Sequence, residues 1–418
     1  MTDSHSLVDH LFRERAGQMV AWLTRAFGPA HMDLAEEVVQ EALVKALQQW
    51  PYTGVPANPG GWLFRVARNR ALDVVRRDAA FRDRAERIAT HLVHGAWRQQ
   101  DSLGPAVTDD ELRMIFLCCH PGLPASGRVA LSLKIVGGFS VPEIARAFLA
   151  TDGVIAQRIT RARRRLRDLD PAFELPPRQA LDPRVDSVLE VIYLLFNEGY
   201  AAHHGEDLVR LDLCGEAFRL ATLIAGSPVA TPAAHALLAL IAFQAARLPA
   251  RVDEQGEIVL LDDQVRSQWD TRLTAIGFEH LDQSAVGPRR TPYHVQAAIA
   301  AAHAAAPSAA ETPWPVILQL YDDLMALAPT PVIALNRVVA VWKARGSAEA
   351  LAALRAIEGD PVLEKYHLLF AVKGRLLANE GDPTGARENF ERALRLPCSA
   401  PERRLLRRQV DAIGGASA

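Results

Sequence analysis

Two stretches of the chain carry arginine at helical spacing, a pattern that suits contact with nucleic acid. In residues 151–170 (TDGVIAQRITRARRRLRDLD) one helical face, termed here the recognition face, presents Gln157, Arg158, Arg161, Arg164 and Arg165. Arginine can bond guanine edges through two hydrogen bonds in a major groove, and it also neutralises phosphates. Few carboxylates stand at i±4 to balance these charges, so DNA binding explains the pattern better than a solvated surface helix does.

The second stretch combines basic, aromatic and amide side chains on one predicted helix over residues 62–77. Its candidate contact residues are Trp62, Arg65, Arg68, Asn69, Arg70, Asp73, Arg76 and Arg77. Several recur at intervals of three or four and therefore share a face. Single-stranded or melting DNA requires such a mixture for phosphate neutralisation, base stacking and hydrogen bonds to base edges. Trp62 taken alone fits a core position better than a stacking platform.

An acidic amphipathic helix is predicted just before the basic one, over residues 34–50, with Pro51 as its end. Its outward side chains, termed here the acidic stripe, are Asp33, Glu36, Glu37, Gln40 and Glu41. The inward positions are apolar: Leu34, Val38, Ala42 and Leu43. Because an acidic surface repels DNA, a functional role for the stripe is docking onto a basic protein partner. The alternative interpretation is that the stripe is only a solvent-exposed helix face with no binding role.

The recognition face lies in a sequence that fits a helix-turn-helix, VPEIARAFLATDGVIAQRITRARRR. Its apolar positions predict the packing of two short helices: Ile144, Ala145 and Phe148 on the first, and Ile155 and Ile159 on the second. Thr151 or Asp152 is suited to cap the second helix.

Helical periodicity dominates the whole chain, and no alternating run indicates strands, so we predict an all-α protein. Prolines and changes in polarity divide it into four parts: a helical domain at 6–78 that begins with a helix over 6–27, a linker at 79–108, a second helical domain at 109–170, and a helical extension at 184–418. The net charge of −2 is unevenly spread, because residues 1–170 hold 23 Lys and Arg against 19 Asp and Glu, and the remainder 24 against 30. A basic front and an acidic back fit a nucleic-acid-binding part joined to one that avoids phosphate.

The end of the extension carries a repeat. Gly346-Ser347 and Gly381-Asp382 recur 35 residues apart, each before an Ala-containing helix. Around the second pair, small and large residues follow a tetratricopeptide pattern: Gly374, Leu377, Ala386, Phe390 and Ala393. A looser copy places Ala350, Leu354 and Ile357 at equivalent positions.

Several other classes of protein find little support. Four cysteines in 418 residues favour a reducing cytoplasm over a disulfide framework, and Cys118-Cys119-His120 lacks a second ligand pair for zinc. No nucleotide-binding or hydrolase motif occurs, so we expect no cofactor and no catalytic site. Residues 220–246 contain no Asp, Glu, Lys or Arg, but Gly226, Pro228 and Pro232 divide them into pieces too short for a membrane span.

Taken together, residues 6–170 resemble the extracytoplasmic-function (ECF) sigma factors of the sigma-70 superfamily. The sequence DLAEEVVQEALVKAL is similar to their polymerase-binding helix, GGWLFRVARNRALDVVRR to the helix that opens and reads the −10 element, and GGFSVPEIARAFLATDGVIAQRITRARRRLR to the helix-turn-helix that reads the −35 element. Residues 184–418 resemble the long extension of one sigma subgroup, from VLEVIYLLFNEGY to the tetratricopeptide-like end.

The resemblance implies that the acidic stripe faces the β′ clamp helices of core RNA polymerase. It implies that the PYTGVPANPG loop and the Arg65–Arg77 helix hold the melted non-template strand of promoter DNA. The extension would serve in regulation or in support of polymerase, through a further protein partner. Two other hypotheses remain: a ligand-sensing helix-turn-helix regulator that acts without polymerase, and a helical-repeat adaptor with incidental basic helices.

Overall fold

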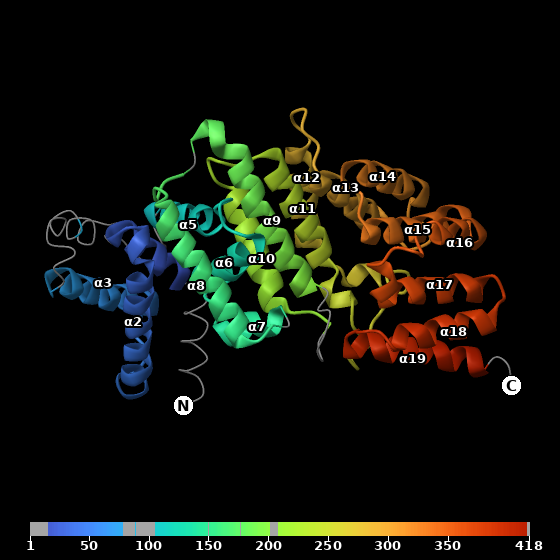
Figure 1. The fold of residues 1–418 in the computed structure, drawn as a ribbon, viewed down its shortest axis with the longest axis horizontal. Coiled ribbons are helices and arrows are strands. Elements are labelled where there is room, and N and C mark those ends of the chain that lie inside the picture. Colours follow the sequence, from blue (N-terminus) through green and yellow to red (C-terminus); the bar gives the residue numbers. More distant parts are fainter. Residues whose placement is uncertain are drawn as a thin grey trace. The chain divides into compact units, whose positions relative to one another are not determined.

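The computed structural model describes residues 16–77, 88, 105–148, 150–175, 177–200 and 208–415. The start of the predicted first helix and most of the predicted linker lie outside these ranges. The chain forms two compact units, Met1–Leu194 and Leu195–Ala418. Figure 1 shows the helices of both, coloured in sequence order. No strand occurs among the described residues, where the one β-contact is an isolated bridge between Val252 and Ile258. The all-α prediction is confirmed.

The first unit contains a helix through residues 16–27, followed by short and long helices. They are η1 (Pro29–His31), α2 (Met32–Thr53), α3 (Pro59–Arg77), α5 (Pro105–Cys118), α6 (Ala125–Ile135), α7 (Val141–Ala147), α8 (Asp152–Leu169), η3 (Arg178–Ala180) and α9 (Leu181–Tyr200), whose last turns belong to the second unit. The helix through residues 16–27 packs against α3 through buried aromatic side chains, since the rings of Trp22 and Phe64 lie 5.8 Å apart.

The ends of α2 and α3 differ from the sequence-based expectation. Pro51 does not end α2, which continues to Thr53. The fixed φ of proline is compatible with a helix, and in the last turn its missing N–H costs one hydrogen bond. Gly54 ends α2 instead, with φ at 80° and its N–H bonded to the Trp50 carbonyl. The next helix starts at Pro59, because the Asn58 side chain accepts a hydrogen bond of 2.7 Å from the Gly61 N–H.

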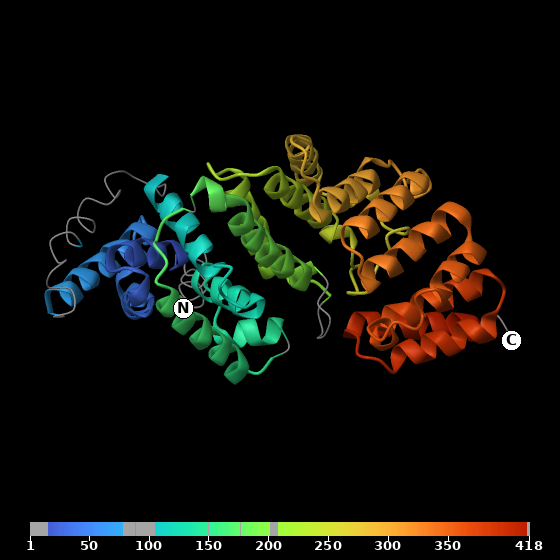
Figure 2. The ribbon, with the colours of Figure 1, turned by 45° about the horizontal axis from the view of Figure 1, so that its top comes forward.

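The second unit consists of helices that follow one another as neighbouring layers (Figure 2). They are α10 (Leu211–Ala225), α11 (Pro232–Ala246), η4 (Leu248–Ala250), η5 (Arg266–Gln268), α12 (Thr271–Ser284), α13 (Pro292–Ala305), α14 (Trp314–Leu327), α15 (Pro331–Arg345), α16 (Ser347–Arg355), η6 (Leu363–Lys365), α17 (His367–Asn379), α18 (Pro383–Leu394) and α19 (Ala400–Gly415). Consecutive α-helices from α10 to α19 contact each other, including α11 and α12, which are joined by the longer segment 247–270.

The uncharged stretch at 220–246 forms parts of α10 and α11. With the following turn, the helical segment Pro232–Ala250 reaches 19 residues, which by length and composition alone is enough to cross a membrane. The expectation that both pieces are too short is therefore wrong for the second. Nevertheless, 72% of its apolar window is buried inside the unit. A helix that is apolar all round and covered by its neighbours is a core helix.

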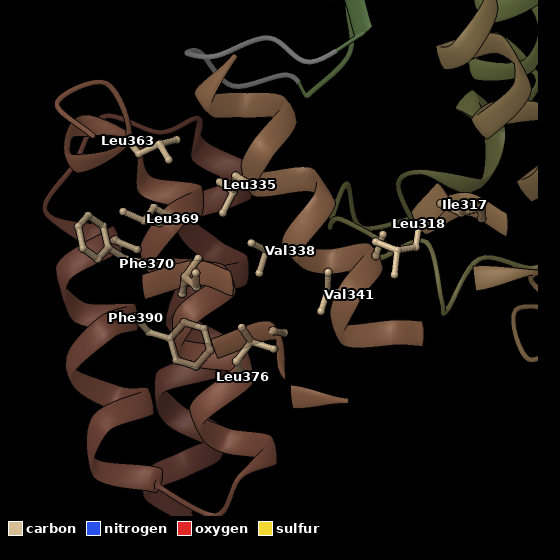
Figure 3. Close-up of a cluster of buried hydrophobic side chains, with 14 of the residues drawn as sticks. Ile317, Leu318, Leu335, Val338, Val341, Leu363, Leu369, Phe370, Leu376 and Phe390 are labelled. Atoms are coloured by element: carbon tan, nitrogen blue, oxygen red, sulfur yellow. The ribbon is translucent and has the colours of Figure 1, made fainter. Parts of the chain in front are cut away.

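The predicted repeat positions form the core of the C-terminal helices. Ala386, Phe390 and Ala393 of α18 are buried, as are Ala350 and Leu354 of α16. Figure 3 shows Phe390 of α18 beside Leu376 of α17, and Phe370 of α17 and Val338 of α15 belong to the same buried cluster. Helices α17 and α18 approach closely at Gly374, where an added Cβ would lie 2.9 Å from the Phe390 ring. This contact explains the glycine of the repeat.

Candidate DNA and polymerase interfaces

Helices α7 and α8 form the predicted helix-turn-helix. Ile144, Ala145, Ile155 and Ile159 are buried, as the sequence indicates, and Phe148 is half-buried. Thr151 caps α8 by accepting a hydrogen bond from the Val154 N–H. The first helix also begins with a capping box, which was not predicted although its Ser-x-x-Glu signature is visible in the sequence: Ser140 and Glu143 bond reciprocally to each other's backbone N–H.

The recognition face is presented outward by α8. Gln157, Arg161, Arg164 and Arg165 are exposed, and Arg158 is half-buried. None of these four arginines forms an ion pair with another residue in the part of the chain that the structure describes. Charged side chains held on a capped helix without internal partners remain available to bases and phosphates.

Beside this face lies a cavity of about 440 Å³ between α8 and the turn that leads into α6. Its lining combines small residues and arginines: Gly122, Pro124, Ser126, Gly127, Arg158, Arg161, Ala162 and Arg165. Three guanidinium groups beside the first turn of a helix favour an anion such as a backbone phosphate. The sequence pattern of α8 does not indicate this cavity, because the other wall is the turn between α5 and α6, which lies about 35 residues earlier in the chain.

Helix α3 exposes much of its predicted basic face, with Arg65, Asn69, Arg76 and Arg77 at the surface. Arg68 and Asp73 are half-buried, and Asp73 lies 3.9 Å from Arg76. Trp62 is half-buried and packs edge-on against Trp50, with ring centroids 5.5 Å apart. This contact favours the core interpretation of Trp62 over stacking on a base.

Arg70 behaves differently from the other basic residues of α3. Its guanidinium donates two hydrogen bonds to the Glu41 carboxylate, one of them 3.0 Å long. These bonds, followed by the charge of Glu41, raise the pKa of Arg70. Two predicted contact residues, one for DNA and one for polymerase, therefore hold α2 and α3 together.

Comparison with known proteins accounts for this arrangement of helices. Residues 11–81 match the family described as Sigma-70 region 2, and residues 113–166 match Sigma-70, region 4. The ECF RNA polymerase sigma factor SigL of Mycobacterium tuberculosis is 31% identical over 168 residues, which cover 39% of this chain and 88% of SigL. The chain belongs to the ECF sigma factors.

The extension of this sigma factor is also shared. Residues 184–285 match a family of unknown function, DUF6596. A protein of Rhizobium meliloti (strain 1021), described only as uncharacterized, is 40% identical over 415 residues, covering 98% of this chain and 96% of that protein. The similarity to that protein therefore spans regions 2 and 4 and the extension of this chain. No solved structure matches the sigma factor significantly.

The acidic stripe of the sigma factor lies on region 2 with its apolar neighbours turned inward. Asp33 and Glu37 are exposed, while Glu36, Gln40 and Glu41 are half-buried. Among the inward positions, Val38, Ala42 and Leu43 are buried and Leu34 is half-buried. The stripe is therefore a continuous surface of α2.

Region 4 supplies cations to one end of this stripe. Arg163 of α8 bonds to Asp33 at 2.6 Å and also to Glu36. Lys134 of α6 lies 3.0 Å from Glu36, and Arg167 lies 3.3 Å from Asp33. These ion pairs are termed here the closed contact. The sequence gives no sign of it, since Arg163 and Asp33 stand 130 residues apart.

The cysteines of the sigma factor are buried and unpaired. Cys119 lies 3.3 Å from the Ser132 hydroxyl, and burial raises the pKa of its thiol to about 11. Burial likewise raises the pKa of Cys214 to about 12. At neutral pH such thiols stay protonated and unreactive. No group of His, Cys, Asp and Glu suited to a metal ion occurs among the described residues.

Proposed function

We propose that this sigma factor divides promoter recognition among three surfaces. The acidic stripe docks onto the β′ clamp helices of core RNA polymerase. The recognition face reads the −35 element as duplex DNA, and the exposed residues of α3 hold unpaired bases of the −10 element. The observation that carries the proposal is the capped helix α8, which displays four arginines without ion-pair partners in the described chain.

The experiment that tests the function is transcription in vitro by core polymerase with the purified protein. A sigma factor confers initiation at one specific promoter start site, whereas a regulator that acts without polymerase binds duplex DNA and confers none. Transcripts that start at random positions, in equal amounts with and without the protein, would refute the proposal.

The −35 assignment predicts a large effect of single arginine substitutions. For Arg158→Ala and Arg161→Ala, we expect specific initiation to fall roughly 10-fold each, because a good bidentate contact contributes about 1–3 kcal/mol of discrimination. Transcript yield is measured on templates with an intact and with a scrambled −35 element. Arg272→Ala serves as the control, since Arg272 is an exposed arginine on α12 of the second unit. Equal losses on both templates would show that these arginines do not read the −35 element.

The −10 assignment is supported by exposed groups of complementary chemistry on α3. Arg65 and Arg76 can neutralise phosphates, and the Asn69 amide can both donate to and accept from base edges. Trp62 contributes to this surface mainly by fixing α3 against Trp50.

For the extension we propose a role in cis, as a regulatory or polymerase-supporting module that acts in the cytoplasm and binds a further protein. Its stacked helices are of the kind that forms protein-binding surfaces. Helix α9 opens the extension, yet it contacts region 4: Arg184 donates a 2.7 Å hydrogen bond to the Phe116 carbonyl, and Arg128 pairs with Glu190 at 2.9 Å. Truncation after Pro183 would remove these contacts as well as the extension.

We therefore predict different results from two truncations. A chain that ends at Tyr200 keeps α9 and folded regions 2 and 4, but loses normal control of its promoter in cells. A chain that ends at Pro183 also loses stability, because the carbonyl and carboxylate contacts of α9 are gone. A promoter–reporter fusion and thermal unfolding distinguish the two effects. Unchanged reporter output for the Tyr200 truncation under every condition would show that the extension has no role in cis.

A further inference from the structure

We propose that the closed contact is an autoinhibitory device, in which region 4 covers part of the polymerase-docking surface of region 2 in the free sigma factor. Lys134 and Arg163 cover Glu36, and Arg163 and Arg167 pair with the carboxylate of Asp33, whose side chain stays 53% exposed. Core polymerase would bind by displacing these cations with its own basic surface. The inference rests on the proposed role of the acidic stripe.

The chemistry of the closed contact matches that of the proposed partner. Arg163 forms ion pairs with the carboxylates of both Asp33 and Glu36, and Lys134 forms a second ion pair with Glu36. The side chains of Arg163, Lys134 and Glu36 are only 19%, 19% and 16% exposed, so water screens their charges less than in surface pairs. A protein that binds the acidic stripe through basic residues must compete for the same two carboxylates.

A second patch holds the two regions together without depending on the acidic stripe. Arg25 lies 2.9 Å from the buried carboxylate of Asp110 on α5, and Gln18 donates a 3.0 Å hydrogen bond to Glu111. Nearby, Gly17 lies so close to the end of α6 that an added Cβ would stand 2.2 Å from the Val136 carbonyl oxygen. The fit at Gly17 is steric, so a neutral substitution there can separate the regions.

Promoter geometry requires the contact to open. Elements named for positions −10 and −35 are centred about 25 base pairs apart, which is about 85 Å along B-DNA at about 3.4 Å per base pair. In the closed contact, side chains of regions 2 and 4 lie 2.6–3.3 Å apart. The two DNA-reading surfaces are therefore too close together in this state to reach both promoter elements at once. The recognition face itself takes no part in the closed contact. The closed contact therefore covers part of the polymerase-docking surface. It also keeps the two DNA-reading surfaces closer together than the promoter elements are.

Masking has a quantitative consequence. When only a fraction of the free chain is open, the apparent dissociation constant for polymerase rises by the inverse of that fraction. Variants that open the closed contact without touching the acidic stripe should therefore bind polymerase more tightly than the wild type.

The test measures binding of full-length variants to core polymerase in the absence of DNA. Arg163→Glu and Lys134→Glu oppose the carboxylates of α2, and Gly17→Leu opens the second patch without a charge change. We expect each to bind roughly 10-fold more tightly, as for a free chain that is about one-tenth open. Arg272→Glu, the same charge reversal at an exposed position of α12, is the matched control and should bind like the wild type.

A second measurement reports the conformation directly. Dyes on cysteines introduced at exposed Tyr52 of α2 and exposed Asp168 of α8 give energy transfer between the two regions, and the four native thiols are buried. Transfer should fall in the three opening variants and when polymerase is added to the wild type. Circular dichroism identifies any variant that does not fold, and the remaining variants then decide the result.

The outcomes separate the two proposals. Unchanged energy transfer in all folded opening variants would show that the closed contact does not hold the free chain together. Reduced transfer without tighter binding would show that the contact masks nothing, and would overturn the autoinhibition while leaving sigma activity intact. Wild-type protein that neither binds polymerase nor supports initiation would overturn the proposed function itself, and autoinhibition with it.

Discussion

Reversing two charges in the acidic stripe, as Glu36→Arg with Glu37→Arg, is expected to weaken binding to core polymerase by roughly 100-fold. Placing like charges against a basic partner costs several kcal/mol, and about 2.7 kcal/mol corresponds to this change in affinity. Both side chains lie on the outer surface of α2, whose inward positions are apolar, so the substitutions leave the core of region 2 intact. Titration of labelled protein with core polymerase gives the affinity.

The two positions contribute differently, which sharpens this prediction. Glu36 takes part in the closed contact, so reversing it both opens the chain and damages the docking surface. Glu37 is exposed and forms no ion pair with another described residue. Glu37→Arg alone should therefore weaken binding by roughly 10-fold without a change in energy transfer between regions 2 and 4. Wild-type affinity in the Glu37→Arg variant, which leaves the closed contact intact, would show that polymerase does not dock at this part of the acidic stripe.

Phe390→Ala is expected to destabilise the C-terminal helices by about 3–5 kcal/mol, the usual cost of truncating a buried phenylalanine. Phe390 is 2% exposed, and its ring lies so close to Gly374 of α17 that an added Cβ there would be 2.9 Å away. Figure 3 shows Phe390 beside Leu376 of the same helix. Relaxation is restricted because Ala386 and Ala393 on the same face are fully buried and too small to fill the cavity.

Urea unfolding of the full chain, followed by tryptophan fluorescence, measures this effect. Both units contain tryptophan, and the unfolding transition of each unit is fitted separately. The transition of the second unit should move to a lower urea concentration, while that of the first stays in place. Val362→Ala is the control, since Val362 is 59% exposed. A loss below about 1 kcal/mol would show that the repeat pattern at Phe390 does not mark the core of this unit.

Much of the fold and part of the site follow from local pattern. The apolar spacing of Ile144, Ile155 and Ile159 predicts two packed helices, and the structure buries all three. Thr151 marks the start of α8 because its hydroxyl satisfies a free N–H of the first turn. The apolar periodicity of each helix and the cap at Thr151 depend on residues only a few positions apart. Such local interactions can be recognised in the sequence without knowing the tertiary structure.

Where local signals compete, prediction from local pattern is less accurate. Proline at position 51 predicts a helix end, yet α2 continues because packing of Trp50 and the glycine at position 54 decide where it stops. The uncharged stretch near α11 has the composition of a membrane span, and only burial by neighbouring helices identifies it as a core helix.

The sequence by itself determined which residues carry charge, which helices form, and the order of the sigma-like segments. Only the tertiary structure decided which charges meet. Arg163 and Arg164 are adjacent on α8, yet Arg163 is bound to two carboxylates of region 2 while Arg164 faces outward. Helical periodicity fixes the direction of a side chain relative to its own helix, whereas its ionic partner depends on chain segments more than a hundred residues away. Electrostatic energy follows distance in space, and that distance is set only when the helices pack.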